Sequence, residues 1–202
     1  KALSKDTTEE LQTTIHPELN FRRNSVNLLI GRRGSGKTYN VFREMIKLGH
    51  IPDRGNYTQL IYVTNKLSDD TFHKMKKLIK LEIVKVKYED VYECLTRIVE
   101  AKEDYAEIVE KKLSDHLDDD YAVELMHTLG VVDFDVPVIH TAVLFDDAIE
   151  VFKNRKSPIY RMLFENRQPK ITYFLAIQDP IGIDASIKSN IDSAWLFGGF
   201  SS

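Results

Sequence analysis

The chain of 202 residues contains a single cysteine, Cys94, and no run of apolar residues as long as the roughly 18 that indicate a membrane span. One thiol forms neither an internal disulfide nor a cysteine metal cluster, which is typical of a reducing compartment. The beginning of the sequence is polar and lacks the apolar core of a signal peptide. We therefore expect a soluble protein without a signal peptide or a transmembrane segment.

An excess of one charge is also missing, since 28 Lys and Arg against 31 Asp and Glu give a net charge of −3. Without a global basic field, any DNA contact has to come from local patches or from a ring of subunits. A hydrophobic fraction of 43% over this length suffices for one well-buried α/β domain. Residues 1–24 carry few core hydrophobes, so we expect an N-terminal arm there and the domain over 25–202.

The strongest signal that is present is the sequence GRRGSGKT at residues 31–38, called here the GRRGSGKT loop. It follows the apolar run 26–30 and precedes a helical pattern, and it fits the spacing GxxxxGK[ST]. In this pattern the glycines let successive backbone N–H groups close around the phosphates of a nucleotide. The candidate nucleotide contacts are Gly31, Arg32, Arg33, Gly34, Ser35, Gly36, Lys37 and Thr38.

Two side chains of this loop have separate roles in the pattern. Lys37 would reach the β- and γ-phosphates, and the hydroxyl of Thr38 would ligate Mg²⁺. The following helix would point its positive N-terminal end at the same anion. A simple Gly/Ser turn after a strand is the alternative, but the Lys-Thr pair in this setting favours a site for ATP and Mg²⁺.

Acidic and amide side chains follow two further apolar runs. AVLF at 142–145 is followed by Asp146 and Asp147, which predicts a metal carboxylate acting through water and a second carboxylate that polarises the attacking water. Capping of the next helix would be the better explanation for an isolated pair. Gln178 ends the run 171–177, where its amide would contact the γ-phosphate or the water, because parallel strands present their carboxyl ends to the ligand.

The remaining pattern predicts alternating strands and helices. Residues 91–113 keep a helical apolar phase through a charged segment, interrupted at Lys102, which fits one long helix or two broken ones. Residues 118–120 should cap a short helix over 122–129 that Gly130 ends, and we expect 91 to about 135 to be a helical insertion rather than core. Residues 179–190 should be a loop. The predicted strands are 25–30, 60–64, 82–87 as an edge strand, 141–145, 171–178 and 194–197.

Taken in order, GRRGSGKT, AVLFDD, LFENR, ITYFLAIQD and IKSNIDSAWLF resemble the poxvirus-type DNA-packaging ATPases of large DNA viruses and virophages. That family belongs to the FtsK/HerA branch of P-loop motors, and the resemblance runs from residue 25 to the end, weakest over 88–135. It implies a RecA-like P-loop NTPase fold, with a mostly parallel central sheet flanked by helices and a helical insertion before the Walker B strand. The sensor strand should lie between the Walker A and Walker B strands.

The resemblance also implies a function and partners. It predicts an ATP-hydrolysing motor subunit that forms a homo-oligomeric ring of five or six copies and packages viral double-stranded DNA into a preformed capsid at the portal vertex. Such a protein would work in the host cytoplasm or viral factory, or with the virion. The alternatives are a nucleotide or nucleoside kinase, for which we find no Arg-rich lid or acceptor pocket, and a nucleotide-bound scaffold without catalysis.

An arginine that completes the neighbouring subunit's site is the last residue that the resemblance implies. Arg167 matches the position of such a finger, with Arg161 one to two helical turns earlier as the alternative. A solvated surface arginine is the competing explanation. Related motors often carry an arginine before the final strand as well, and the lysine at this place, Lys188, weakens that assignment.

Overall fold

The computed structural model describes residues 23–48, 57–112, 117–136, 138–147, 149–152, 155–179 and 183–198. Residues 1–22 of the predicted N-terminal arm lie outside these ranges. So does Gly49, where the sequence predicts a glycine C-cap for the helix that follows the GRRGSGKT loop. Within the described ranges, no helix combines the length and the hydropathy that a membrane span requires.

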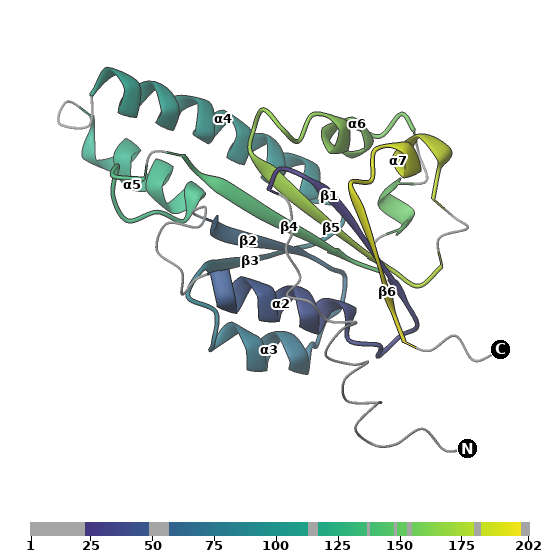
Figure 1. Cartoon of the computed structure of the whole chain (residues 1–202). Coiled ribbons are helices and arrows are strands. Elements are labelled where there is room, and N and C mark those ends of the chain that lie inside the picture. The colour runs from purple at the N-terminus through teal and green to yellow at the C-terminus, as the bar shows by residue number, and fades with distance from the viewer. Residues whose placement is uncertain are drawn as a thin grey trace, which may run out of the picture.

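A single sheet of six parallel strands forms the centre of the structure (Figure 1). The strand order is β3-β2-β4-β5-β1-β6, so β5 lies between β1 and β4 as the RecA-like prediction requires, and β3 is an edge strand as predicted. The strands are β1 (Val26–Gly31), β2 (Tyr57–Val63), β3 (Glu82–Val86), β4 (His140–Asp146), β5 (Ile171–Ile177) and β6 (Ser193–Phe197).

Helices cover both faces of this sheet (Figure 1). On one face lie α2 (Lys37–Leu48) and α3 (Asp70–Lys76), and on the other lie α4 (Val91–Lys111), α6 (Pro158–Phe164) and α7 (Ala185–Ser189). Successive strand residues point to opposite faces, so that Leu144 packs in the α2 and α3 cluster and Phe145 in the α4 and α6 cluster. Strands buried on both faces explain the unbroken apolar runs of β4 and β5.

The segment between β3 and β4 is helical, as predicted, and consists of the unbroken α4 and of α5 (Asp119–Leu129). Asp118 caps α5 and Gly130 ends it with a φ of 66°, which confirms the predicted cap and end, but the helix begins at Asp119, three residues before the predicted start at Ala122. The expectation that this segment lies outside the core is wrong for the first half of α4. Val91, Leu95 and Ile98 form one stripe that packs in the same cluster as the strand residues, and only the second half of α4 extends to pack on α5.

Two short helices were not predicted from periodicity. The loop expected over 179–190 contains α7, whose N-cap Asp184 accepts a hydrogen bond from the Ser186 N–H. A 3₁₀ helix, η2 (Ile149–Phe152), follows β4. Helices of one turn carry too few residues to show a 3.6-residue period.

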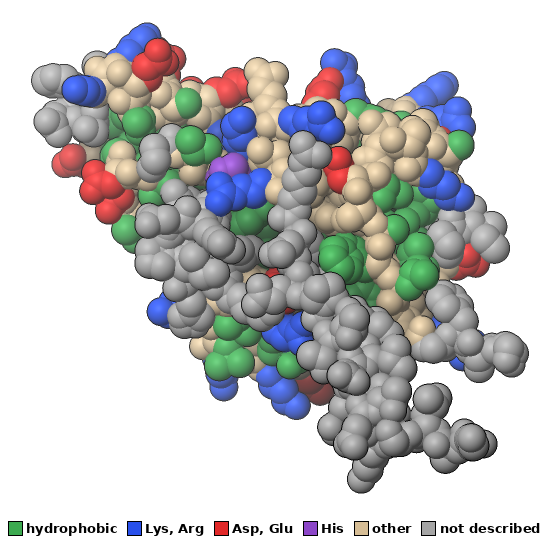
Figure 2. All heavy atoms as spheres, viewed as in Figure 1, with side chains coloured by type: hydrophobic (Ala, Val, Ile, Leu, Met, Phe, Trp, Pro, Cys, Tyr) green, Lys and Arg blue, Asp and Glu red, His purple; other side chains and the backbone are tan. Residues whose placement is uncertain are grey.

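Because all six strands are parallel, their carboxyl ends meet at one edge of the sheet, the carboxyl edge, and their amino ends at the opposite amino edge. The side of the molecule seen in Figure 2 carries basic and acidic side chains scattered among each other on its described part. This view therefore agrees with the absence of a single-sign field that the net charge indicates.

Candidate active site

The GRRGSGKT loop joins β1 to α2 at the carboxyl edge. Gly34 and Gly36 adopt φ values of 77° and 89°, which residues other than glycine rarely adopt. A Cβ atom on Gly31 would lie 2.5 Å from Ser35 Oγ and 2.6 Å from the Phe197 carbonyl oxygen. Glycine is thus required at these positions by backbone conformation and by close packing, and the loop has the shape that its sequence pattern predicts.

Lys37 begins α2 and is almost completely buried. Its Nζ donates to the carbonyl oxygens of Gly31 at 2.6 Å and Arg32 at 3.1 Å. Burial lowers the pKa of Lys37, and the negative charges of Asp147 and Asp146 raise it in part. The side chains of Arg32 and Arg33 are exposed. The loop therefore holds one buried lysine beside two aspartates.

Asp146 ends β4 and is 2% exposed. Thr38 Oγ1 donates to Asp146 Oδ1 at 2.8 Å, and the hydroxyl of Tyr62 donates to Asp146 Oδ2 at 2.9 Å. Mg²⁺ prefers oxygen ligands and is usually held by one or two protein groups together with substrate phosphates. Thr38 Oγ1 and Asp146 Oδ1 are adjacent oxygen ligands of this kind, so these two residues fit Mg²⁺ bound together with a nucleotide.

Asp147 and Gln178 lie beside each other at the ends of β4 and β5. The Asp147 N–H donates to the Ala176 carbonyl oxygen at 2.9 Å, and Gln178 Nε2 donates to Asp147 Oδ2 at 3.2 Å. Asp147 Oδ1 is buried and has no hydrogen-bond partner among the described residues. The structure therefore brings together Lys37, Thr38, Asp146, Asp147 and Gln178, and one carboxylate oxygen is left to accept a proton from a water molecule.

Three side chains around Asp146 were missed by the sequence reasoning: Tyr62, Lys66 and Tyr88. Lys66 Nζ forms an ion pair with Asp146 Oδ2, and the hydroxyl of Tyr88 donates to the Asp146 carbonyl oxygen at 2.6 Å. Burial and then the charge of Asp146 raise the pKa of Tyr62 well above its usual value and that of Tyr88 to about 12. Both phenols therefore stay protonated donors at neutral pH.

Arg167 lies away from this group, because it precedes β5 and therefore sits at the amino edge. Its side chain is 75% exposed, and Nη2 is 3.7 Å from Asp192 Oδ1. Arg161, the alternative finger, bonds Glu165 on the same helical turn at 2.8 Å. Lys188 lies exposed on α7. None of these three belongs to the group at the carboxyl edge.

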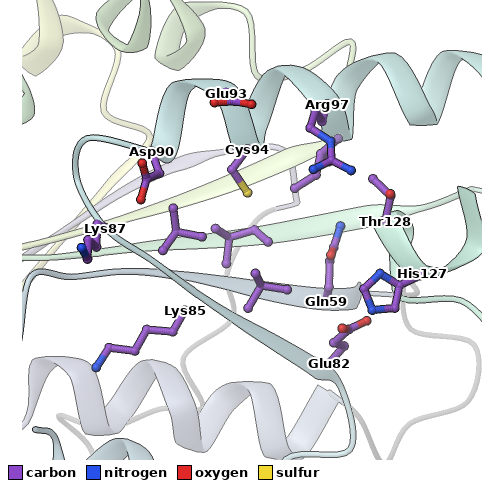
Figure 3. Close-up of a pocket in the computed structure, with 14 residues that line it drawn as sticks. Gln59, Glu82, Lys85, Lys87, Asp90, Glu93, Cys94, Arg97, His127 and Thr128 are labelled. Atoms are coloured by element: carbon purple, nitrogen blue, oxygen red, sulfur yellow. The ribbon is translucent and has the colours of Figure 1, made fainter. Parts of the chain in front are cut away.

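A cavity of about 510 Å³ lies elsewhere, between the sheet face of β2 and β3 and the helices α4 and α5 (Figure 3). Its lining includes Gln59, Glu82, Arg97 and His127 but none of the predicted site residues. The buried amide of Gln59 has no hydrogen-bond partner among the described residues. The cavity is therefore separate from the candidate active site.

No protein-family model matches the sequence, and no curated protein matches it. The fold, in contrast, is similar to that of solved structures. B204, the DNA-packaging ATPase from Sulfolobus turreted icosahedral virus, is similar over 90% of this chain and 78% of its own, with a TM-score of 0.51 and 16% identity. B204 from Sulfolobus turreted icosahedral virus 2 in complex with ATP-γS is similar over 88% of this chain and 77% of its own, with a TM-score of 0.51 and 16% identity.

ATPases 2 and 3 of EssC from Geobacillus thermodenitrificans are similar as well, with a TM-score of 0.52 and 12% identity over 88% of this chain. The chain spans 33% of that EssC chain. These similarities confirm the predicted RecA-like P-loop NTPase fold. B204, which is a viral DNA-packaging ATPase, is among the proteins that share this fold.

Proposed function

We propose that this protein is an ATP-hydrolysing motor subunit that packages viral double-stranded DNA into a preformed capsid, as a homo-oligomeric ring of five or six copies at the portal vertex. The observation that carries the proposal is the convergence of Lys37, Thr38, Asp146, Asp147 and Gln178 at the carboxyl edge. The B204 packaging ATPases share the fold over most of their length, which supports the choice of a packaging motor among ATPases.

Each of these residues has a role that follows from its chemistry. Lys37 binds the β- and γ-phosphates, because its buried ammonium lies at the phosphate-facing loop. Thr38 and Asp146 hold Mg²⁺, which when bound neutralises charge on the phosphates. Asp147 polarises the attacking water through its unpartnered oxygen, and Gln178 fixes the orientation of Asp147 by the hydrogen bond at 3.2 Å.

A ring is proposed because an arginine from a neighbouring subunit commonly stabilises the charge that develops on the γ-phosphate during its transfer. Arg167 cannot supply it within its own chain: seven strand residues separate the two edges of the sheet, which is about 20 Å at 3.3 Å per residue. As an exposed side chain at the amino edge it is available to a neighbouring subunit. Arg167 is therefore our candidate for a finger that acts in trans.

The proposal is tested by measuring ATP hydrolysis with and without double-stranded DNA. We expect Mg²⁺-dependent hydrolysis that DNA stimulates, and loss of hydrolysis in Lys37→Ala, because that substitution removes a charge-assisted phosphate contact of about 1.5–3 kcal/mol. Lys80→Ala, a change of an exposed lysine, is the matched control. Hydrolysis that DNA does not change would contradict the DNA motor and leave an ATPase; no nucleotide binding at all would contradict both.

A further inference from the structure

Lys66 reaches the candidate active site from β2, a strand that carries none of the predicted site residues. It follows the end of β2 by three positions, and β2 is the neighbour of β4, whose last residue is Asp146. The ion pair between Lys66 Nζ and Asp146 Oδ2 joins residues 80 positions apart in the sequence. Parallel packing of β2 and β4 therefore adds a second lysine to the site that Lys37 enters from the opposite side.

The partners of Asp146 show which contact is able to change. Its Oδ1 accepts from Thr38, and its Oδ2 already accepts from both Tyr62 and Lys66, which uses the two lone pairs of that oxygen. Tyr62 is fully buried, and its single hydroxyl proton is shared between Asp146 Oδ2 and Asp69 Oδ2. A further cation that approaches Oδ2 must therefore displace Lys66 rather than Tyr62.

The side chain of Lys66 is free to move although its main chain is held. Lys66 N–H donates to Thr64 Oγ1 at 3.2 Å, and Lys85 Nζ donates to the Lys66 carbonyl oxygen at 2.7 Å. In contrast, the Lys66 side chain is 41% exposed. Its ammonium can thus leave Asp146 without any change of the backbone that carries it.

Formal charges indicate where the ammonium would go. Lys37 and Lys66 balance Asp146 and Asp147, so the group of four is neutral. A nucleotide triphosphate with its divalent cation adds a net negative charge, and the oxygens that carry it face the GRRGSGKT loop. We propose that Lys66 is a second phosphate-contacting lysine, whose ammonium exchanges its ion pair with Asp146 for a contact with the phosphate oxygens when Mg²⁺ and nucleotide bind. The inference rests on the proposed ATPase function.

The test measures binding, not turnover. A fluorescent ADP analogue is titrated at increasing Mg²⁺ and is then displaced by ADP or by ATP-γS, for the wild type and for Lys66→Met. Because Lys66 and Mg²⁺ compete for Asp146, the Mg²⁺ concentration at half-maximal binding should fall about tenfold in Lys66→Met. Because the phosphate contact is lost, the preference for ATP-γS over ADP should also fall about tenfold.

Two variants and one control complete the design. Lys66→Arg keeps the charge and should stay close to the wild type in both measurements, and Lys66→Gln repeats the test if thermal denaturation shows that Lys66→Met is unfolded. Lys87→Met removes an exposed lysine near the same edge that pairs only weakly with Glu89, at 3.5 Å, and should change neither quantity.

The outcomes separate this inference from the proposed function. If the wild type binds nucleotide but Lys66→Met shows an unchanged Mg²⁺ midpoint, a higher midpoint, or an unchanged ATP-γS preference, the role of Lys66 is wrong and the ATPase proposal stands. If the wild type binds neither nucleotide, both are wrong. Shifts of both quantities in the expected direction, with Lys66→Arg near the wild type, support the exchange of partners.

Discussion

Two buried lysines, one at each edge of the sheet, make the same kind of contact and differ in their surroundings. Lys37 at the carboxyl edge is 6% exposed and donates to the carbonyl oxygens of Gly31 and Arg32. Lys102 on α4 is 9% exposed and donates to the carbonyl oxygens of Pro169 and Lys170 near the amino edge. Direct contacts alone would assign the two lysines the same role.

Their neighbouring charges distinguish them. Burial lowers the pKa of both, but Asp147 and Asp146 counteract this at Lys37, whereas Lys170 adds to it at Lys102 and the pKa there falls to about 7. Carboxylates therefore oppose the effect of burial on the lysine at the carboxyl edge, whereas a second lysine adds to it at the amino edge. A buried lysine therefore indicates a phosphate site only when carboxylates lie beside it.

The largest expected effect on ATP turnover concerns Arg167, the amino-edge residue that we propose as the finger acting in trans. Arg167→Ala should lower DNA-stimulated ATP turnover by about 10³–10⁵-fold, because an arginine supplied in trans stabilises the charge on the transferring phosphoryl group. Nucleotide affinity and thermal stability should stay unchanged, since the side chain is 75% exposed and its nearest carboxylate is 3.7 Å away. Turnover and nucleotide binding of the purified variant check this.

Mixing variants tests whether the arginine acts between subunits. Arg167→Ala and Lys37→Ala subunits are each inactive alone, but mixed rings should regain some turnover where one subunit supplies Arg167 and its neighbour supplies Lys37. Arg161→Ala, which removes a surface pair with Glu165, is the control and should be active. Full activity of Arg167→Ala alone would show that Arg167 has no role in hydrolysis.

The next effect separates the two aspartates at the carboxyl edge. Asp147→Asn should lower hydrolysis by about 10²–10⁴-fold and keep Mg²⁺-dependent nucleotide binding, because only the group that polarises water is lost. Asparagine suits this position, since Asp147 has a φ of 55° that Asn tolerates and Ala does not. Asp146→Asn should in addition weaken the Mg²⁺ dependence of binding. Equal loss of nucleotide binding in both variants would show that the aspartates do not divide these roles.

The sequence predicted the parts of the site that are contiguous in the chain. Lys37 and Thr38 follow from one eight-residue pattern, and Asp146 and Gln178 follow from the rule that parallel strands end at one edge. The position of β5 between β1 and β4 was predicted only through the resemblance to a family, because periodicity shows that strands are buried but not which strands are neighbours.

The parts that were missed depend on contacts between distant segments. Tyr62 and Lys66 reach Asp146 because β2 pairs with β4, across 84 and 80 positions of sequence. Lys102 was read as an interruption of the apolar phase of α4, whereas its stem is buried and its ammonium meets carbonyl oxygens of the segment before β5. No local pattern records such a partner.

The smallest expected effect concerns Lys102 and is a change of stability. Lys102→Met leaves the carbonyl oxygens of Pro169 and Lys170 without this donor, which should lower the free energy of unfolding by about 1–3 kcal/mol at alkaline pH. Lys111→Met, at an exposed position of the same helix that pairs with Glu107, should lower the free energy of unfolding much less, because exposed ion pairs contribute little to stability. Denaturant unfolding of the three proteins measures both differences.

The pH dependence of that difference identifies its cause. The pKa of Lys102 is about 7 in the folded protein and near its usual 10.5 in the unfolded chain, so between these values the unfolded chain binds more protons and stability rises with pH. The contribution is complete above 10.5 and is lost as the pH falls towards 7. The destabilisation by Lys102→Met should therefore be largest near pH 10 and shrink towards pH 7, whereas that of Lys111→Met should stay constant from pH 7 to 9. A difference for Lys102→Met that does not change with pH would mean that the pKa of Lys102 is not lowered in the folded protein, and that neighbouring charges do not distinguish the two lysines.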